Sequence, residues 1–217
     1  MPIKPEILRI YAITDAACIG QRDFDAAVEA ALRGGVRILQ LREKHLDEKA
    51  LTEKARRIKA ICARYGALLI VNDNYRAALE AGADGVHVGA SDASVAEIRR
   101  TAGENFLIGA TAKTVAQAQA AQAAGADYLG VGALFPSPTK TDAIRVTAQQ
   151  FREIAGSVTI PAVAIGGISY ENLPELRGIG AAGAALVSAV FGAADIESET
   201  RKLHTRCMDV FGTSERG

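Results

Sequence analysis

The stretch Gly125-Ala126-Asp127-Tyr128-Leu129-Gly130 joins an alanine-rich helical segment to an apolar run with the character of a buried strand. Its first glycine suits the position just after a helix, where a left-handed backbone is common. The same design recurs at Gly35-Val36-Arg37-Ile38-Leu39-Gln40, Gly82-Ala83-Asp84-Gly85-Val86-His87 and Gly180-Ala181-Ala182-Gly183-Ala184-Ala185. A unit of two strands and two helices thus occurs four times, which favours a closed (β/α)8 barrel over an open doubly wound sheet.

Short apolar runs alternate with amphipathic segments along the chain, which indicates parallel strands covered by helices. The predicted strands are 9–14, 38–43, 68–73, 85–89, 106–111, 128–134, 162–166 and 184–189. The predicted helices are 24–33, 47–65, 75–81, 94–102, 115–124, 148–154, 172–177 and 195–210, with Ser94 and Asn172 as N-caps. No linker divides the sequence, so we expect residues 1–217 to form one barrel domain with a loose tail after about residue 211.

Composition narrows the class of protein. The 217 residues lie near the lower end of the size range of such barrels, and the 49% hydrophobic content is enough for a large core. Because 25 basic and 25 acidic residues balance, nothing favours nucleic acid or an anionic membrane as a partner. Cys18, Cys62 and Cys207 form no CxxC pair, so neither a disulfide framework nor a zinc site is indicated. Without a signal-peptide core or a membrane-length apolar run, we expect a soluble cytoplasmic protein.

In a (β/α)8 barrel the functional residues lie at the carboxyl ends of the strands. The second predicted strand ends Gln40-Leu41-Arg42-Glu43-Lys44, where alternation places Gln40, Arg42 and Lys44 on one face. A planar guanidinium beside an ammonium suits a polyanion. The alternative is that these side chains are simply solvated.

Two acidic residues, Asp73 and Asp92, follow the neighbouring third and fourth strands. A carboxylate from each strand end suits Mg²⁺, which takes one or two protein carboxylates together with phosphate oxygens of a substrate. The alternative is that Asp92 caps the next helix and Asp73 makes a turn. His87 lies within the fourth strand, where a hydrogen-bonded core histidine is expected more often than a catalytic one.

A second anion site is predicted at the seventh and eighth strands. Gly166-Gly167 permits close backbone approach and Ser188 adds a hydroxyl, in the loops that commonly bind phosphate in this fold. The loop 137–140, Ser-Pro-Thr-Lys, lies between the two anion sites in strand order. The residue types therefore predict two phosphorylated substrates, one of them bound with a metal.

Together these motifs resemble the thiamine phosphate synthase family over nearly the whole chain. They are Tyr11-Ala12-Ile13-Thr14-Asp15, Gln40 to Lys44, Asn72-Asp73-Asn74, Gly85-Val86-His87-Val88-Gly89 with Asp92, Gly132 through Thr139-Lys140, Ile165-Gly166-Gly167-Ile168 and Val187-Ser188-Ala189. The resemblance implies a barrel enzyme, a transferase of thiamine biosynthesis. It would join 4-amino-2-methyl-5-(diphosphooxymethyl)pyrimidine to 4-methyl-5-(2-phosphoethyl)thiazole. It also implies a dissociative mechanism, in which pyrophosphate leaves before the thiazole nitrogen captures the pyrimidine methyl cation.

The resemblance assigns roles to matching residues. Those implied to bind the pyrimidine diphosphate are Gln40, Leu41, Arg42, Glu43, Lys44, Asn72, Thr111 and Lys140. Those implied to bind the thiazole phosphate are Ser137, Pro138, Thr139, Gly167, Val187 and Ser188. Asp73 and Asp92 would bind Mg²⁺, and Lys140, Arg42 and Lys44 would act in catalysis.

The sequence departs from the family pattern at a few positions. Ala90 stands where glutamine is usual, Thr111 where serine is usual, and Lys113 where histidine is common. Two alternatives to the synthase function stay open. One is a related enzyme that isomerises the thiazole phosphate, and the other is a barrel that binds phosphorylated metabolites without catalysis. Neither alternative needs the paired carboxylates. The sequence leaves the oligomeric state open, a homo-oligomer included.

Overall fold

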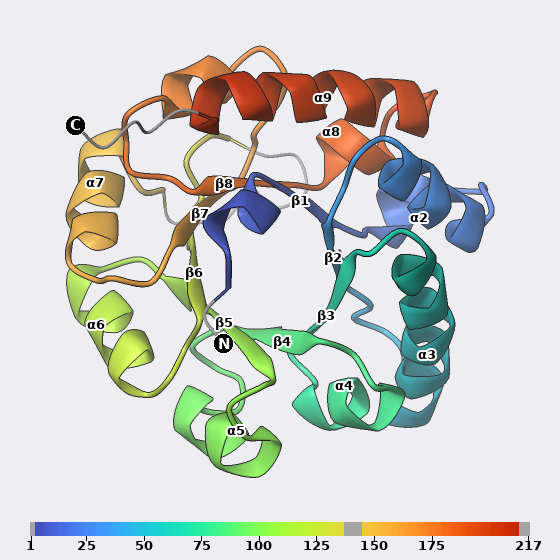
Figure 1. Cartoon of the computed structure of the whole chain (residues 1–217), viewed down its shortest axis with the longest axis horizontal. Helices are drawn as coiled ribbons and strands as arrows, with labels where there is room; N and C mark the ends of the chain where they lie inside the picture. Colours follow the sequence, from blue (N-terminus) through green and yellow to red (C-terminus); the bar gives the residue numbers. More distant parts are fainter. Residues whose placement is uncertain (1–2, 137–144, 213–217) are drawn as a thin grey trace.

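The eight predicted strands are all present, and they close into a parallel barrel in chain order, with the last strand paired to the first (Figure 1). The computed structural model describes residues 3–136 and 145–212. The strands are β1 (Ile10–Ile13), β2 (Ile38–Leu41), β3 (Leu68–Asn72), β4 (Gly85–Val88), β5 (Leu107–Ala112), β6 (Tyr128–Gly132), β7 (Ala162–Ile165) and β8 (Gly183–Leu186). The prediction of a closed (β/α)8 barrel is therefore confirmed.

Helices form the outer layer around the strands in Figure 1. They are α1 (Ala16–Ile19), α2 (Phe24–Arg33), α3 (Glu48–Arg64), α4 (Tyr75–Ala81), α5 (Val95–Ala102), α6 (Val115–Ala123), α7 (Ala148–Gly156), α8 (Ser188–Phe191) and α9 (Ile196–Phe211). Two short 3₁₀ helices, η1 (Pro5–Leu8) and η2 (Leu173–Leu176), complete the described elements. Among the described residues, no helix combines the length and apolar character needed to cross a bilayer. The last part of the predicted loose tail, residues 213–217, lies outside the described residues.

Strand alternation divides the buried side chains into two layers. Leu39 and Leu41 of β2 pack in the large cluster between the strands and the helices. Ile38 of the same strand packs inside the barrel, in a cluster that also contains Tyr11 and Tyr128. Leu8 of η1 belongs to that inner cluster too, so η1 covers the amino ends of the strands. The open end of the barrel is consequently the carboxyl end.

One predicted strand is too long, and one predicted helix is of another type. The eighth strand ends at Leu186, and Ser188 and Ala189 lie in α8 rather than in the strand. The segment 173–176 is a 3₁₀ helix instead of an α-helix. In both cases the segment has too few residues for its periodicity to separate one type of element from another. The helix α8 buries Val190 and Phe191.

The repeated stretches form turns at the amino ends of the even-numbered strands. Their first glycines have positive φ angles, from 69° at Gly82 to 115° at Gly35. In the second and third copies the acid is structural, because Asp84 accepts from Leu69 N–H and Asp127 from Ile108 N–H, each at 2.7 Å. These carboxylates tie the start of one strand to the next, at the end of the barrel opposite the predicted site.

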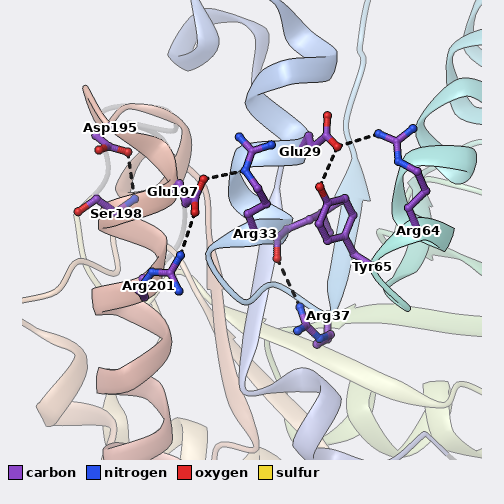
Figure 2. A network of polar contacts seen from close by, with 10 residues as sticks. Glu29, Arg33, Arg37, Arg64, Tyr65, Asp195, Glu197, Ser198 and Arg201 are labelled. Carbon is purple, nitrogen blue, oxygen red and sulfur yellow. Dashed lines mark hydrogen bonds and ion pairs between the residues drawn. The ribbon is translucent and has the colours of Figure 1, made fainter.

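The outer surface also carries a polar network that links α2, α3 and α9, shown in Figure 2. Glu29 of α2 accepts from Arg64 and from the Tyr65 hydroxyl at the end of α3, at 2.8 and 2.7 Å. Glu197 of α9 pairs with Arg33 of α2 at 2.7 Å. Exposed pairs of this kind contribute about 0–1 kcal/mol each. We therefore assign this network to the joining of α2 with α3 and α9 rather than to ligand binding.

Candidate active site

A cavity of about 210 Å³ opens at the carboxyl ends of the strands. Its floor is formed by side chains inside the barrel, including Tyr11 and Tyr128. Its rim is formed by residues at the strand ends, including Arg42, Asn72 and Gly167. The cavity therefore lies at the end of the barrel where the sequence places the site.

The guanidinium of Arg42 is held on one side of the cavity by an acid that the sequence analysis did not single out. Its Nη1 lies 3.1 Å from Oδ2 of Asp15, in a pair whose side chains are only 25% and 14% exposed. The other oxygen of Asp15 accepts from Cys18 N–H and so caps α1. The Thr14 hydroxyl accepts from the backbone N–H of Arg42 at 2.9 Å. The end of β1 thus fixes both the backbone and the side chain of Arg42.

The residues Gln40 to Lys44, at and after the end of β2, do not all face the cavity. Gln40 and Arg42 line it, as alternation predicts. Leu41 is fully buried in the helix layer, and Glu43 pairs with Lys54 of α3 at 2.5 Å. Lys44 is exposed, and its charge acts on Asp73. The side chains of Leu41 and Glu43 do not line the cavity. Their predicted roles in ligand binding stay predictions.

The two predicted metal ligands lie beside each other. Burial and the neighbouring Asp92 carboxyl raise the pKa of Asp73 to about 6, although Lys44 and Asn72 oppose the shift. Asp73 has a φ angle of 63°, and among the described residues it is the non-glycine residue with a positive φ. Its N–H donates to the His87 carbonyl at 2.9 Å. Two adjoining carboxyls, one of them on strained backbone, are the kind of arrangement that a cation stabilises.

The alternative role for Asp92 is wrong. The N-cap of α5 is Ser94, whose hydroxyl accepts from Glu97 N–H at 3.2 Å. Asp92 instead accepts from Gly89 N–H at 2.7 Å, which points its carboxyl back toward the end of β4. No group of three or more metal-ligating side chains occurs in the part of the chain that the structure describes. A cation at Asp73 and Asp92 would need further oxygen ligands from water or a phosphorylated ligand, which is how Mg²⁺ is usually held.

Hydrogen bonds cross the floor of the cavity. Gln40 Nε2 donates to the Tyr11 hydroxyl at 2.9 Å, and the Tyr11 and Tyr128 hydroxyls lie 2.8 Å apart. His87 Nδ1 lies 3.3 Å from the Tyr128 hydroxyl, and its Nε2 lies 3.1 Å from the Thr111 hydroxyl. His87 is therefore a hydrogen-bonded histidine, as expected, but it also lines the cavity.

His87 should make the stability of the protein depend on pH. Burial lowers its pKa from 6.5 to about 4, so between these values the unfolded chain binds a proton that the folded chain does not. The free energy of unfolding should then fall as the pH falls from 6.5 to 4, by up to about 3 kcal/mol. We expect the variant His87→Gln to flatten this part of the curve in urea titrations. The exposed His45, changed to Gln, serves as the control, and an equal slope for His87→Gln and the wild type would contradict the prediction.

Another side of the cavity is built from β7, β8 and α8. Gly167 lines it with a φ angle of 62°, and its carbonyl accepts from Asn172 Nδ2 at 2.9 Å. Asn172 Oδ1 accepts from Ser169 N–H, so this side chain closes the turn after β7 rather than capping a helix as predicted. Val187 and Ser188 line the same side, with Ser188 as the first residue of α8. The first N–H groups of a helix have no partner within it, so they are available to an anion.

The chain is similar to known proteins over most of its length. Residues 10–190 match the family model described as thiamine monophosphate synthase. The chain belongs to this family. The thiamine-phosphate synthase of Ruminiclostridium cellulolyticum is 42% identical over 89% of this chain and 92% of its own length. That of Thioalkalivibrio sulfidiphilus is 44% identical over 89% and 92%. A solved thiamine phosphate pyrophosphorylase from Pyrococcus furiosus is 35% identical, with a TM-score of 0.88 over 96% of this chain and 99% of that one.

Membership of the thiamine monophosphate synthase family confirms the resemblance stated from the motifs. A 3-hexulose-6-phosphate synthase structure, 18% identical with a TM-score of 0.69, shares the fold alone. Within the predicted site, the structure brings together two groups around one cavity: Gln40, Arg42, Asn72 and Thr111, and Gly167, Val187 and Ser188. Lys113 lines the cavity as well, close to Thr111. Ser137, Pro138, Thr139 and Lys140 lie outside the described residues.

One residue of this family member that the sequence gave no reason to select is Arg22. Its guanidinium donates to the carbonyls of Cys18 and Ile19, both within α1, at 2.7 and 2.9 Å. It also donates to the carbonyls of Phe191 and Ala193, at and beyond the end of α8. Arg22 therefore fastens α1, which Asp15 begins, to α8, which Ser188 begins. The contact joins segments about 170 residues apart, so no local pattern could reveal it.

Proposed function

We propose that this chain is a thiamine phosphate synthase that joins 4-amino-2-methyl-5-(diphosphooxymethyl)pyrimidine to 4-methyl-5-(2-phosphoethyl)thiazole and releases pyrophosphate. The observation that carries the proposal is the pairing of two anion-binding sides around one cavity. Arg42 and Asn72 line one part of it, and Gly167 and Ser188 line another. Asp73, whose carboxyl adjoins that of Asp92, directly follows Asn72 in the chain. A reaction between a diphosphate and a monophosphate needs such a division, with the reacting carbon and the reacting nitrogen between the two anions.

Asp73 and Asp92 are the residues that would hold Mg²⁺. Their adjoining carboxyls, the raised pKa of Asp73 and the lack of a third protein ligand among the described residues fit a cation that is completed by substrate oxygens. When bound, Mg²⁺ supplies positive charge against the pyrophosphate that leaves. Lys44, whose charge already reaches Asp73, and Arg42, held by Asp15, contribute fixed positive charge at the same end.

The reaction needs charge stabilisation and positioning more than proton transfer. The carbon–oxygen bond to the diphosphate breaks with its electron pair on pyrophosphate, and the thiazole nitrogen then donates its lone pair to the pyrimidine methyl cation. That nitrogen carries no proton, so no general base is required. The floor of the cavity fits this requirement, because both nitrogens of its histidine, His87, are already hydrogen-bonded to Tyr128 and Thr111. Positioning of two substrates in one cavity supplies the rest.

Gly167 and Ser188 are proposed to hold the thiazole phosphate through backbone N–H groups. A short helix after the eighth strand is a recurrent phosphate site in (β/α)8 barrels. Gln40, Asn72 and Thr111 are proposed to hold the pyrimidine, and Ser137 to Lys140 keep the roles implied by the resemblance. The three cysteines are free thiols, which fits a reducing compartment, so we place the reaction in the cytoplasm.

The proposal is tested by a direct assay. Purified protein is mixed with both substrates, with Mg²⁺ or with a chelator, and thiamine phosphate is measured by chromatography. We expect product that requires both substrates and Mg²⁺. Binding of the thiazole phosphate without any product would favour the isomerase-like relative or the binding-only barrel, and equal product in the chelator would reject the metal role.

A further inference from the structure

We propose that Tyr11, Tyr128 and His87 are positioning residues that give the pyrimidine end of the cavity a fixed polarity. In this arrangement Gln40 presents an acceptor to the ligand and Thr111 presents a donor, because the two side chains are the ends of one directional hydrogen-bond chain. The inference rests on the proposed function for its substrate, and it adds the reason why the site would choose a 4-aminopyrimidine over a 4-oxopyrimidine.

The chain is continuous and largely buried. Its four contacts are 2.9, 2.8, 3.3 and 3.1 Å long, from Gln40 through the two tyrosines and His87 to Thr111. Gln40, Tyr11 and Tyr128 are 3%, 2% and 0% exposed. A buried polar group that lacks a partner destabilises the fold, so every proton between the buried atoms of this chain has to be donated to a neighbour.

Counting protons sets the direction. Gln40 Nε2 can only donate, so the Tyr11 oxygen accepts from it and the single Tyr11 proton goes to Tyr128. Tyr128 then has its own proton left for His87 Nδ1, since its contacts in the chain are Tyr11 and His87. A histidine that accepts at Nδ1 carries its proton at Nε2.

The last contact follows in the same way. His87 Nε2–H donates to the Thr111 oxygen, which leaves the Thr111 proton free to point into the cavity. At the other end, the nitrogen of the Gln40 amide is engaged by Tyr11, so its oxygen is the free atom. Both residues line the cavity. The two ends therefore offer an acceptor and a donor whose roles cannot be exchanged without breaking the chain.

Two further observations keep the chain in place. Burial raises the pKa of both tyrosines, so both hydroxyls keep their protons at physiological pH. The rings also pack against glycine backbone. A Cβ atom at Gly109 would overlap the Tyr128 ring and His87 Nδ1, and one at Gly130 would lie 3.0 Å from His87 Cε1. The rings therefore have little room to turn.

The polarity selects a class of ligand. A 4-aminopyrimidine presents an N–H donor beside a ring nitrogen that accepts, which matches the Gln40 oxygen and the Thr111 proton. A 4-oxopyrimidine presents an acceptor beside a ring N–H. Its acceptor would face the Gln40 oxygen and its N–H would face the Thr111 proton, so neither hydrogen bond could form. Sites built on such hydrogen bonds reject mismatched analogues by about 10⁴-fold. We expect the wild type to favour the amino substrate over the oxo analogue by at least about 10³-fold in kcat/KM.

The kinetic experiment compares these two pyrimidine diphosphates in wild-type protein and in Tyr128→Phe. Removal of the Tyr128 hydroxyl allows the Thr111 hydroxyl and the Gln40 amide to exchange their donor and acceptor roles. The preference for the amino substrate over the oxo analogue should therefore fall at least about tenfold. Tyr75→Phe is the matched control, because Tyr75 is also buried and donates to Glu97 at 2.9 Å outside the cavity. An unchanged preference in Tyr128→Phe would overturn the inference, and Tyr11→Phe repeats the test should Tyr128→Phe fail to fold.

A spectroscopic experiment tests the direction without catalysis. In protein labelled with nitrogen-15, the ring nitrogens of His87, assigned by their loss in His87→Gln, should show a proton on Nε2 and none on Nδ1. A proton on Nδ1 would overturn the inference whether or not the protein makes thiamine phosphate. Absence of product from both pyrimidines in wild-type protein would instead reject the proposed function, so the two failures are distinguishable.

Discussion

Asp73→Asn should lower kcat/KM by about 10³-fold or more, which corresponds to about 4 kcal/mol of transition-state stabilisation. The substitution exchanges one carboxylate oxygen for an amide and leaves the shape unchanged. Asparagine also tolerates the positive φ angle of 63° at this position, so the backbone should be kept. A pair of carboxylates reduced to one is a much weaker site for Mg²⁺, and the leaving pyrophosphate loses its cation.

The same variant should be more stable than the wild type when no metal is present. The pKa of Asp73 is raised from 3.8 to about 6, so the folded protein loses stability as the pH rises through this range. Because the group is half-buried, solvent reduces the effect, and we expect a gain of about 1 kcal/mol at pH 8. A loss of activity joined to a gain in stability is difficult to explain by damage to the fold.

Steady-state rates over a range of Mg²⁺ concentrations and thermal unfolding in a chelator are the measurements. Asp23→Asn is the control, since Asp23 caps α2 on the exposed surface and asparagine caps a helix equally well. Normal turnover by Asp73→Asn would remove Asp73 from the site. Lower stability in the chelator would mean that its carboxyl supports the fold.

Much of the barrel could be predicted because its determinants are local. The glycine at each repeated turn and the change from helical to strand periodicity depend on neighbouring residues, and alternation correctly separated Gln40 and Arg42 from Leu41. The direction of Glu43, toward Lys54, also follows from that alternation. The errors fell where an element is about one turn long, as at α8 and η2.

The functional residues that the sequence did not reveal were missed for a different reason, which is that their partners are distant along the chain. Tyr11 and Tyr128 are 117 residues apart and meet only because β1 and β6 face each other across the inside of the barrel. A tyrosine inside a strand reads as core, and nothing local distinguishes one whose hydroxyl belongs to a hydrogen-bond chain. Asp15 was within a quoted motif, but its role depends on the contact of its carboxylate with Arg42, 27 residues later. Sequence patterns therefore located the rim, and packing determined how its members are held.

Gly167→Ala should raise the KM for the thiazole phosphate by about tenfold to 100-fold and lower the free energy of unfolding by about 3 kcal/mol. A side chain in the left-handed region costs about 1–2 kcal/mol. The rest of the effect is steric, because a Cβ atom at Gly167 would overlap the carbonyl oxygens of Phe135 and Pro136. Backbone cannot give way as a flexible side chain does, so either the turn after β7 or the segment after β6 must move.

Gly178→Ala separates these two causes. Gly178 has a φ angle of 72°, close to the 62° of Gly167, but no atom lies within 4 Å of the position that its Cβ would take. It should therefore show the backbone cost of about 1–2 kcal/mol without the steric part. Urea denaturation of both variants gives the stability difference, and steady-state kinetics gives the KM. Equal losses of stability would mean that the contact with Phe135 and Pro136 relaxes freely. An unchanged KM in Gly167→Ala would mean that this turn does not hold the phosphate, because the displaced backbone is the same backbone whose N–H groups are proposed to bind it.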